Sequence, residues 1–145
     1  MQILFFAVIA SLIGGASVSM QSALASLIGQ RLGSMESIFI VHLGGALAIG
    51  LPLILMGGRN LGEWRSVPWY ALLAGALGIV VVGGANFAIP RLGVTTTITI
   101  FVTGQLCVSL LLDQFGLLGI EPHPITWTRL LGVGILALGA RLVMG

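Results

Sequence analysis

The sequence predicts an all-α integral membrane protein with five transmembrane helices. Hydrophobic residues make up 57% of its 145 residues and charged residues only 7%, against about 25% charged in a typical soluble domain. The apolar runs are continuous and about 20 residues long, which is the length of a membrane-spanning helix; a membrane β-barrel would show alternating segments of about ten residues. The 22 glycines are typical of membrane helices that pack closely through small residues.

The first two apolar runs predict the first two spans. The first is expected over residues 3–25, within one helix that continues to Gly33. No positive charge precedes this run, which argues against a cleaved signal peptide. The second span is expected over residues 36–56, with Ser34 as its N-cap, because a serine side chain accepts a hydrogen bond from a free N–H group at a helix start.

The third span is predicted over residues 68–88, after a polar loop over residues 57–67. Pro68 suits the first position of this helix because its missing N–H group has no partner there anyway. Trp64 in the loop is an aromatic residue of the kind that lies at the membrane–water boundary. Residues 89–93 (IPRLG) are then expected to form a tight turn, short enough only for an antiparallel helical hairpin.

The last two spans are predicted over residues 94–118 and 125–144, so the whole chain, 1–145, is expected to be a single transmembrane domain. The fourth span is not uniformly apolar. Threonines crowd its first half, and Gln105 lies near its middle. Polar side chains at bilayer depth are costly unless they face protein or a water-filled cavity, so we expect this helix to line a site.

The basic residues predict dual topology. Lysine is absent, and the arginines fall three on each side of the membrane if the five spans alternate: Arg59, Arg65 and Arg129 against Arg31, Arg91 and Arg141. Orientation follows the imbalance of Lys and Arg between loops, and an even tally favours insertion in both directions. The alternative is that Arg129 and Arg141 lie too deep in the last helix to count, which would leave a weak bias.

Polar side chains inside the spans are the candidates for a solute site: Gln21, His42, Asn86, Thr103 and Gln105. The alternative is that they only join one helix to the next, which contributes about 0.6 kcal/mol per hydrogen bond on average. His42 is the first candidate for proton coupling, because histidine ordinarily changes its charge between about pH 5 and 8. Asp113 is the second, although its place near a span end favours a structural role paired with an arginine.

No motif predicts an enzyme, a cofactor or a metal site. A Gly-rich loop ending in Lys-Ser/Thr, the signature of nucleotide binding, is absent along with lysine itself. His42 and His123 have no Cys or carboxylate companion at metal-ligand spacing. Cys107 is the single cysteine, so there is no disulfide framework. A net charge of only +2 gives no reason to expect nucleic acid as a partner.

Several motifs resemble those of one family. They are Gln21 followed by Gly33-Ser34; Asn86-x-x-x-Pro90-Arg91-Leu92-Gly93; T-G-Q-L-x-x-S-L-L-L-D-x-F-G over residues 103–116; Arg129-x-x-Gly132; and Gly139-x-Arg141. In these residues, over nearly its whole length, the chain resembles the drug/metabolite transporter superfamily and, within it, the short single-repeat YdcZ-like proteins. One departure is Ala25, where the family pattern often has Asn four residues after the first-helix Gln.

The resemblance implies a secondary transporter subunit in a bacterial-type cytoplasmic (inner) membrane. Its five helices would form one inverted-repeat half, completed by a second copy as an antiparallel homodimer or by a close paralogue. A small polar or cationic solute would move by alternating access at the dimer interface. The alternative is a structural or accessory membrane subunit of a larger complex.

Gly132 and Gly139 are the predicted dimer contact. They resemble the heptad-spaced glycines through which the last helices of the more distant small multidrug resistance proteins pair. The essential first-helix glutamate of those proteins has no counterpart in this chain.

Overall fold

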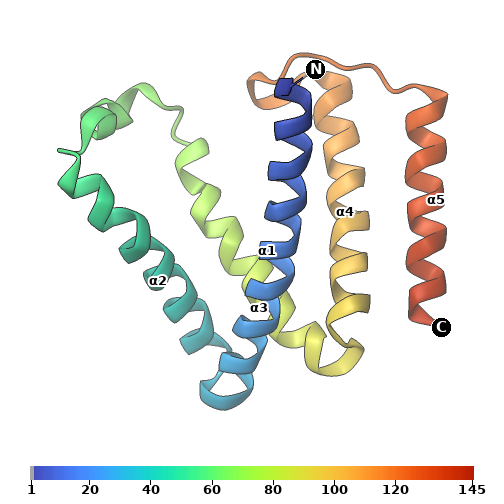
Figure 1. Ribbon diagram of the computed structural model, residues 1–145, viewed down its shortest axis with the longest axis horizontal. Helices are drawn as coiled ribbons and strands as arrows, with labels where there is room; N and C mark the ends of the chain where they lie inside the picture. The colour runs from blue at the N-terminus through green and yellow to red at the C-terminus, as the bar shows by residue number, and fades with distance from the viewer. Residues whose placement is uncertain (1) are drawn as a thin grey trace. The chain divides into compact units, whose positions relative to one another are not determined.

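The structure, a computed structural model, describes residues 2–145 apart from the side chain of Arg59. Five long helices make up most of this part of the chain, and it contains no strand (Figure 1). They are α1 (Gln2–Leu32), α2 (Ser34–Leu55), α3 (Ala74–Leu92), α4 (Val94–Phe115) and α5 (Trp127–Met144). Three short 3₁₀ helices join them: η1 (Arg59–Ser66), η2 (Ala71–Leu73) and η3 (Leu117–Gly119). All five long helices are apolar enough to cross a membrane, the third when counted from Ala71, which confirms the all-α prediction.

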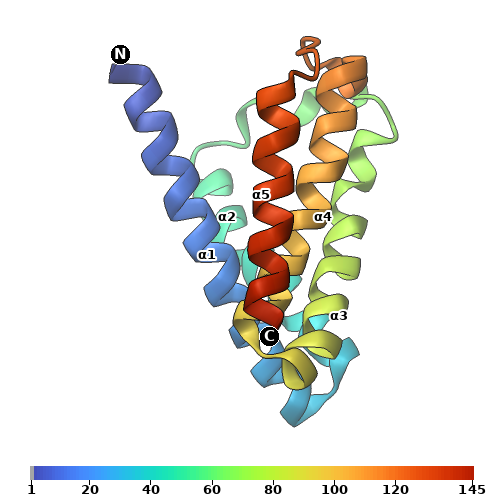
Figure 2. The same ribbon diagram turned by 90° about the vertical axis from the view of Figure 1, so that its right-hand side faces the viewer.

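The chain divides into two compact units, residues 1–91 with α1 to α3 and residues 92–145 with α4 and α5. In the first unit α1 and α2 pack as a hairpin, and Figure 1 shows them diverging away from the turn that joins them. In the second unit α4 and α5 pack against each other. Figure 2 shows the helices of each unit from the side.

Single glycines make two of the helix connections. Gly33 joins α1 to α2 with φ 114° and ψ 155°, and Gly93 joins α3 to α4 with φ 80° and ψ 164°. Only glycine adopts this region readily, because a Cβ would clash there. The tight turn predicted over residues 89–93 is therefore wrong in length, since α3 continues through Pro90 to Leu92. A proline usually interrupts a helix, but in membrane helices neighbouring groups compensate for the lost hydrogen bond.

Two predicted helix starts also need correction. Gly33, with no side-chain cap, precedes α2, and Ser34 is the first residue of the helix rather than its N-cap. The third helix begins later than Pro68. The Pro68 carbonyl accepts a hydrogen bond from the N–H of Ala71 at 2.9 Å, and the regular α-helix starts only at Ala74.

The buried residues of the first unit are mostly small: Ser22, Ala25, Ser26, Ser37, Val82, Ala85, Asn86 and Ile89. On α1 they recur every three or four residues, which places them on one face of the helix. Most large apolar side chains of the chain are exposed instead. This arrangement suits a membrane protein, whose helices approach closely through small residues while large apolar residues face lipid.

Candidate functional site

A buried polar cluster joins all three helices of the first unit near the Gly33 turn. We call it the Asn86 cluster: Asn86 on α3, Ser34 and Ser37 on α2, and Ala25 and Gly29 on α1. The Asn86 Nδ2 group donates to the Ser34 hydroxyl at 3.2 Å and to the Ser34 carbonyl at 3.4 Å. The Ser37 hydroxyl donates to the Ala25 carbonyl at 2.7 Å and lies 3.4 Å from Asn86 Oδ1. Ser37 is 0% exposed and Asn86 9%.

The Asn86 amide is committed to helix packing. A hydroxyl carries one proton, and Ser37 uses its proton in the short bond to Ala25, so its contact with Asn86 is the weaker one. Gly29 provides the space for the amide, because a Cβ at Gly29 would lie 2.9 Å from Asn86 Cγ. Ala25, the departure from the family pattern, is part of this buried helix contact.

His42 lies on the same α2–α3 seam. Its Nδ1 atom is 2.7 Å from the Ile38 carbonyl, and because a carbonyl only accepts, Nδ1 carries the proton in this contact. Nε2 is then the free nitrogen of the neutral ring. It faces Gly78 on α3, where an added Cβ would lie 2.7 Å from it. The Nε2 atom makes no hydrogen bond over residues 2–145, and the missing side chain of Gly78 provides the space it occupies against α3.

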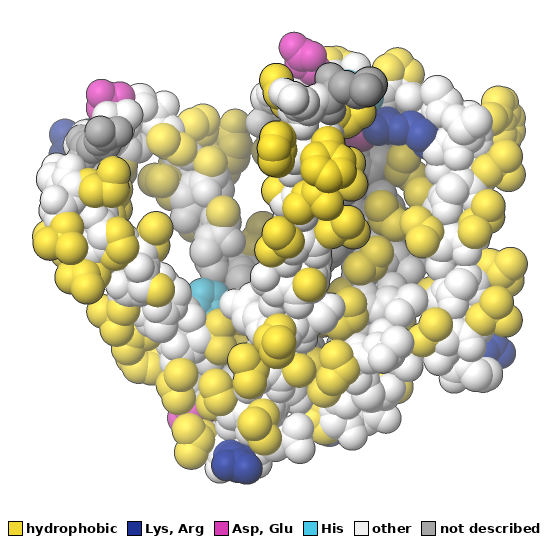
Figure 3. All heavy atoms as spheres, in the orientation of Figure 1, with side chains coloured by type: hydrophobic (Ala, Val, Ile, Leu, Met, Phe, Trp, Pro, Cys, Tyr) yellow, Lys and Arg dark blue, Asp and Glu magenta, His cyan; other side chains and the backbone are white. Residues whose placement is uncertain are grey.

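Gln21 faces a different space, a groove of about 680 Å³ between α1 and α2. Met20 and Leu24 line it from α1, and Val41 and Gly44 from α2. Gln21 is exposed and makes no side-chain hydrogen bond within the part of the chain that the structure describes. The space-filling view shows the first unit open between α2 and α1, and the histidine colouring in that opening belongs to a different space from the Gln21 groove (Figure 3). His42 and Asn86 do not line this groove.

Gln105 and Thr103 lie on α4, in the second unit. The Thr103 hydroxyl bonds to the Thr99 carbonyl at 2.9 Å, and Thr99 bonds in the same way to Thr95 at 2.7 Å. These threonines therefore satisfy their hydroxyls within their own helix. Gln105 is exposed and, over residues 2–145, forms no side-chain hydrogen bond. Its amide is the strong polar group of this helix that still needs a partner.

Asp113 closes the hairpin between α4 and α5. Its carboxylate accepts from Arg129 Nη2 at 2.8 Å, with Arg129 40% and Asp113 28% exposed. Arg129 Nη1 also donates to the His123 carbonyl at 3.1 Å, and the His123 N–H donates to the Asp113 carbonyl at 2.8 Å. The arginine partner expected for Asp113 is thus Arg129, and the pair fixes the loop before α5.

The glycine face of α5 is open. A Cβ added at Gly132 or Gly139 would meet nothing within 4 Å. The structure contains one chain, so the predicted dimer contact through these glycines stays a prediction.

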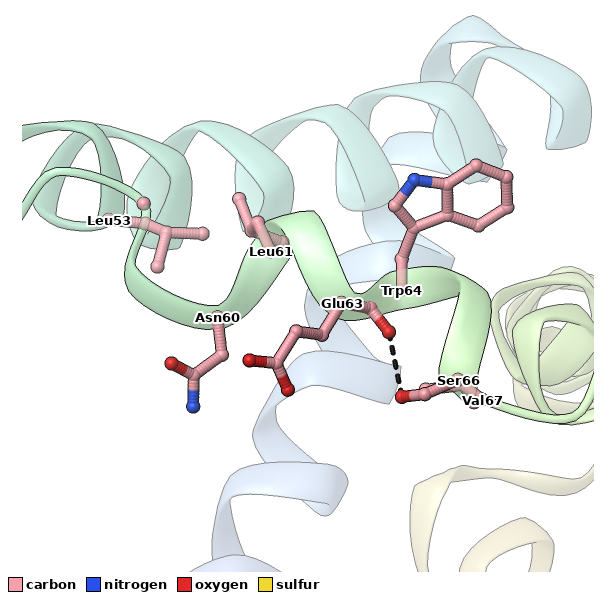
Figure 4. Close-up of a pocket in the computed structure, with 8 residues that line it drawn as sticks. Leu53, Asn60, Leu61, Glu63, Trp64, Ser66 and Val67 are labelled. Atoms are coloured by element: carbon pink, nitrogen blue, oxygen red, sulfur yellow. Dashed lines mark hydrogen bonds between the residues drawn. The ribbon is translucent and has the colours of Figure 1, made fainter.

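A second pocket of about 560 Å³ lies between the end of α2 and η1. Figure 4 shows Asn60 and Glu63 on one side of η1 and Trp64 on the other. The Arg65 guanidinium lies 5.5 Å from the centre of the Trp64 ring, and the Ser66 hydroxyl bonds to the Glu63 carbonyl at 2.8 Å. This amphipathic segment is typical of an element at a membrane surface, outside the predicted solute site.

The sequence interpretation missed Ser37 and the spaces left by Gly29 and Gly78. A signal was present, because Arg-Leu-Gly occurs twice, ending at Gly33 and at Gly93, and a hydroxyl residue follows each glycine four positions later. Both hydroxyl residues are buried, Ser37 at 0% and Thr97 at 1% exposure. Their N–H groups bond to the carbonyls of Gly33 at 3.1 Å and Gly93 at 3.2 Å. The repeat therefore marks two equivalent helix starts.

A protein-family model described as "Putative inner membrane exporter, YdcZ" matches residues 6–142. The match extends over α1 to α5. Together with the five apolar helices of membrane length, it confirms the expected family and the location in the inner membrane. No curated protein and no solved structure matches the chain.

Proposed function

Since the chain belongs to the YdcZ family of inner membrane exporters, we propose that it is one subunit of a secondary transporter that moves a small solute by alternating access. Transporters of this kind bind the solute near the middle of the bilayer, at the interface of two inverted repeats. One chain supplies one repeat, and a second copy in the opposite orientation supplies the other.

The observation that carries this proposal is the pair of unpartnered glutamine amides. Gln21 and Gln105 lie well inside helices of membrane length, both are exposed, and neither has a hydrogen-bond partner over residues 2–145. Such groups are costly at bilayer depth unless they face protein or a water-filled cavity. A second copy and a solute-filled cavity meet that requirement.

Two further features favour an antiparallel homodimer. The open face at Gly132 and Gly139 allows a second α5 to approach closely, as small residues do in other membrane helix pairs. The three-against-three division of arginines allows the same chain to insert in either direction. Both orientations are needed if one gene product forms both halves.

Within the dimer, the polar residues take different roles. Gln21, Gln105 and Thr103 contact the solute. His42 adds its free Nε2 atom and is the first candidate for proton coupling, with Asp113 the second. Asn86 was predicted to bind solute as well, but its amide is occupied by Ser34, so we assign it to holding the helices that carry the site.

The test is solute flux by the purified chain. A thermal-shift screen with a solute library identifies a ligand, and the ligand is then loaded into liposomes that contain the chain alone. We expect flux that Gln105→Ala and Gln21→Ala remove while the dimer stays folded. Asn60→Ala, an amide in the loop after α2, is the matched control and should transport normally. A folded dimer that binds the ligand without flux would instead favour the accessory-subunit alternative.

A further inference from the structure

We propose that the groove between α1 and α2 binds an uncharged amphipathic solute, with its apolar body against the groove walls and its hydrogen-bonding group on Gln21. This inference rests on the proposed transport function, and it names the class of solute. The sequence alone left polar and cationic solutes both open.

The charges of the chain argue against an ionic solute in this groove. No charged side chain lines it. Among the carboxylates, Glu36 lies against Gly33 at the start of α2, Asp113 is paired with Arg129, and Glu63 and Glu121 are outside the five long helices. An ion at bilayer depth without a counter-charge is strongly disfavoured. A solute bound here is therefore neutral.

The shape of the groove suits a small molecule. Its volume of about 680 Å³ lies within the roughly 300–1,000 Å³ of small-molecule pockets. On the α2 wall, Gly44 and Gly45 leave open space beside Ile40 and Val41, and a Cβ at either glycine would meet nothing within 4 Å. Met20 and Leu24 form the opposite wall. Methionine adapts readily to ligands of different outline, so the walls suit an aliphatic or aromatic body.

Gln21 is the one side chain lining the groove that is free to hydrogen-bond to the solute and orient it. Ser17 also lines the groove, but its hydroxyl donates to the Ile13 carbonyl at 2.8 Å. Gln21 keeps an amide with one acceptor and two donor positions. An alcohol or an amide complements it. The lining residues are largely exposed in the single chain, so the groove is open to a solute that partitions into the bilayer, from the lipid or from the cavity shared with a second copy.

Photolabelling of the purified chain in phospholipid bilayers tests this site directly. The probes are a diazirine-bearing octanol and its trimethylammonium counterpart, which has the same chain and a positive charge. We expect the octanol probe to label Met20, Leu24 and Val41, as mapped by mass spectrometry. Gly44→Leu adds four carbons to the groove wall and should lower this labelling by at least about tenfold, since even one methylene in a hydrophobic pocket changes binding by about tenfold or more. Gly50→Leu is the matched control, because it lies on α2 outside the groove and also meets nothing within 4 Å.

Two variants at Gln21 test the chemistry of recognition. Gln21→Leu should weaken octanol labelling by about threefold, the average value of one membrane hydrogen bond. Gln21→Glu should raise labelling by the cationic probe. If the cationic probe labels the groove of the wild type as strongly as the octanol probe does, the assignment to neutral solutes is wrong.

Other outcomes separate this inference from the transport proposal. Labelling spread evenly over exposed positions of all helices, unchanged by Gly44→Leu, means ordinary partition into the membrane and refutes the groove site. Labelling requires neither flux nor a dimer. Groove labelling without flux thus refutes the transport proposal and supports the groove site. Flux without groove labelling supports the transport proposal and refutes the groove site.

Discussion

The packing of Gly29 against Asn86 predicts that Gly29→Ala lowers the free energy of unfolding in the wild type but not in an Asn86→Ala variant. In the wild type, Gly29→Ala places a Cβ 2.9 Å from Asn86 Cγ, closer than real Cβ atoms approach, so the amide must shift away from its position against Ser34. Three contacts of 3.2 to 3.4 Å are then lost or weakened. At about 0.6 kcal/mol for each membrane hydrogen bond, the free energy of unfolding falls by about 1–2 kcal/mol.

In the Asn86→Ala background the same change should do no harm. Asn86→Ala alone removes the contacts and costs a similar 1–2 kcal/mol, about 0.6 kcal/mol for each bond. With the amide gone, the three nearest atoms to the new Cβ are removed, and Gly29→Ala gains up to about 1 kcal/mol of helix propensity. The double-mutant cycle therefore predicts a coupling of about 1–3 kcal/mol, within the range for residues in contact.

The assay is reversible unfolding in mixed micelles of mild detergent and dodecyl sulfate, followed by circular dichroism. Gly14→Ala, on the same helix with nothing within 4 Å of the added Cβ, is the control and should be neutral or slightly stabilising. Equal destabilisation by Gly29→Ala in both backgrounds would refute this account of the Asn86 cluster.

Three further predictions concern orientation, assembly and coupling. With Cys107 replaced, a single cysteine at Gly62 should react with an impermeant thiol reagent in about half of the molecules from each face, because the arginine tally shows no bias; labelling from one face alone would exclude dual topology. Gly139→Leu should convert dimer to monomer in mild detergent, since the close α5 contact needs small residues, and a dimer that survives both this change and Gly132→Leu must pair elsewhere. If flux varies between about pH 5 and 8, His42→Ala should remove the variation, and variation that persists would assign coupling to another group.

Sequence reasoning worked where the physical signal was strong and local. Continuous apolar runs of bilayer length lead directly to five helices, whatever their packing. The prediction of a tight turn over residues 89–93 was wrong. Helix α3 runs on to Leu92 and ends before Gly93, whose positive φ needs a glycine.

The contacts of the polar residues within the spans could not be predicted from one sequence. Asn86 was recognised as a membrane-depth amide, but its partners Ser34 and Ser37 depend on the register between α2 and α3, which no local pattern determines. Gln21 and Asn86 were expected to act together, yet one faces the groove and the other is buried in the helix contact. The repeated Arg-Leu-Gly was readable from the sequence and would have pointed to Ser37.

Flux by the purified chain alone is the most direct test of the proposed transporter. Liposomes that contain only this chain are loaded with a solute found by thermal shift, and its release is followed over time. The account predicts release that protein-free liposomes lack and that Gln105→Ala removes without loss of the folded dimer. A stable, solute-binding dimer that gives no release, or release unchanged by Gln105→Ala and Gln21→Ala, would contradict it.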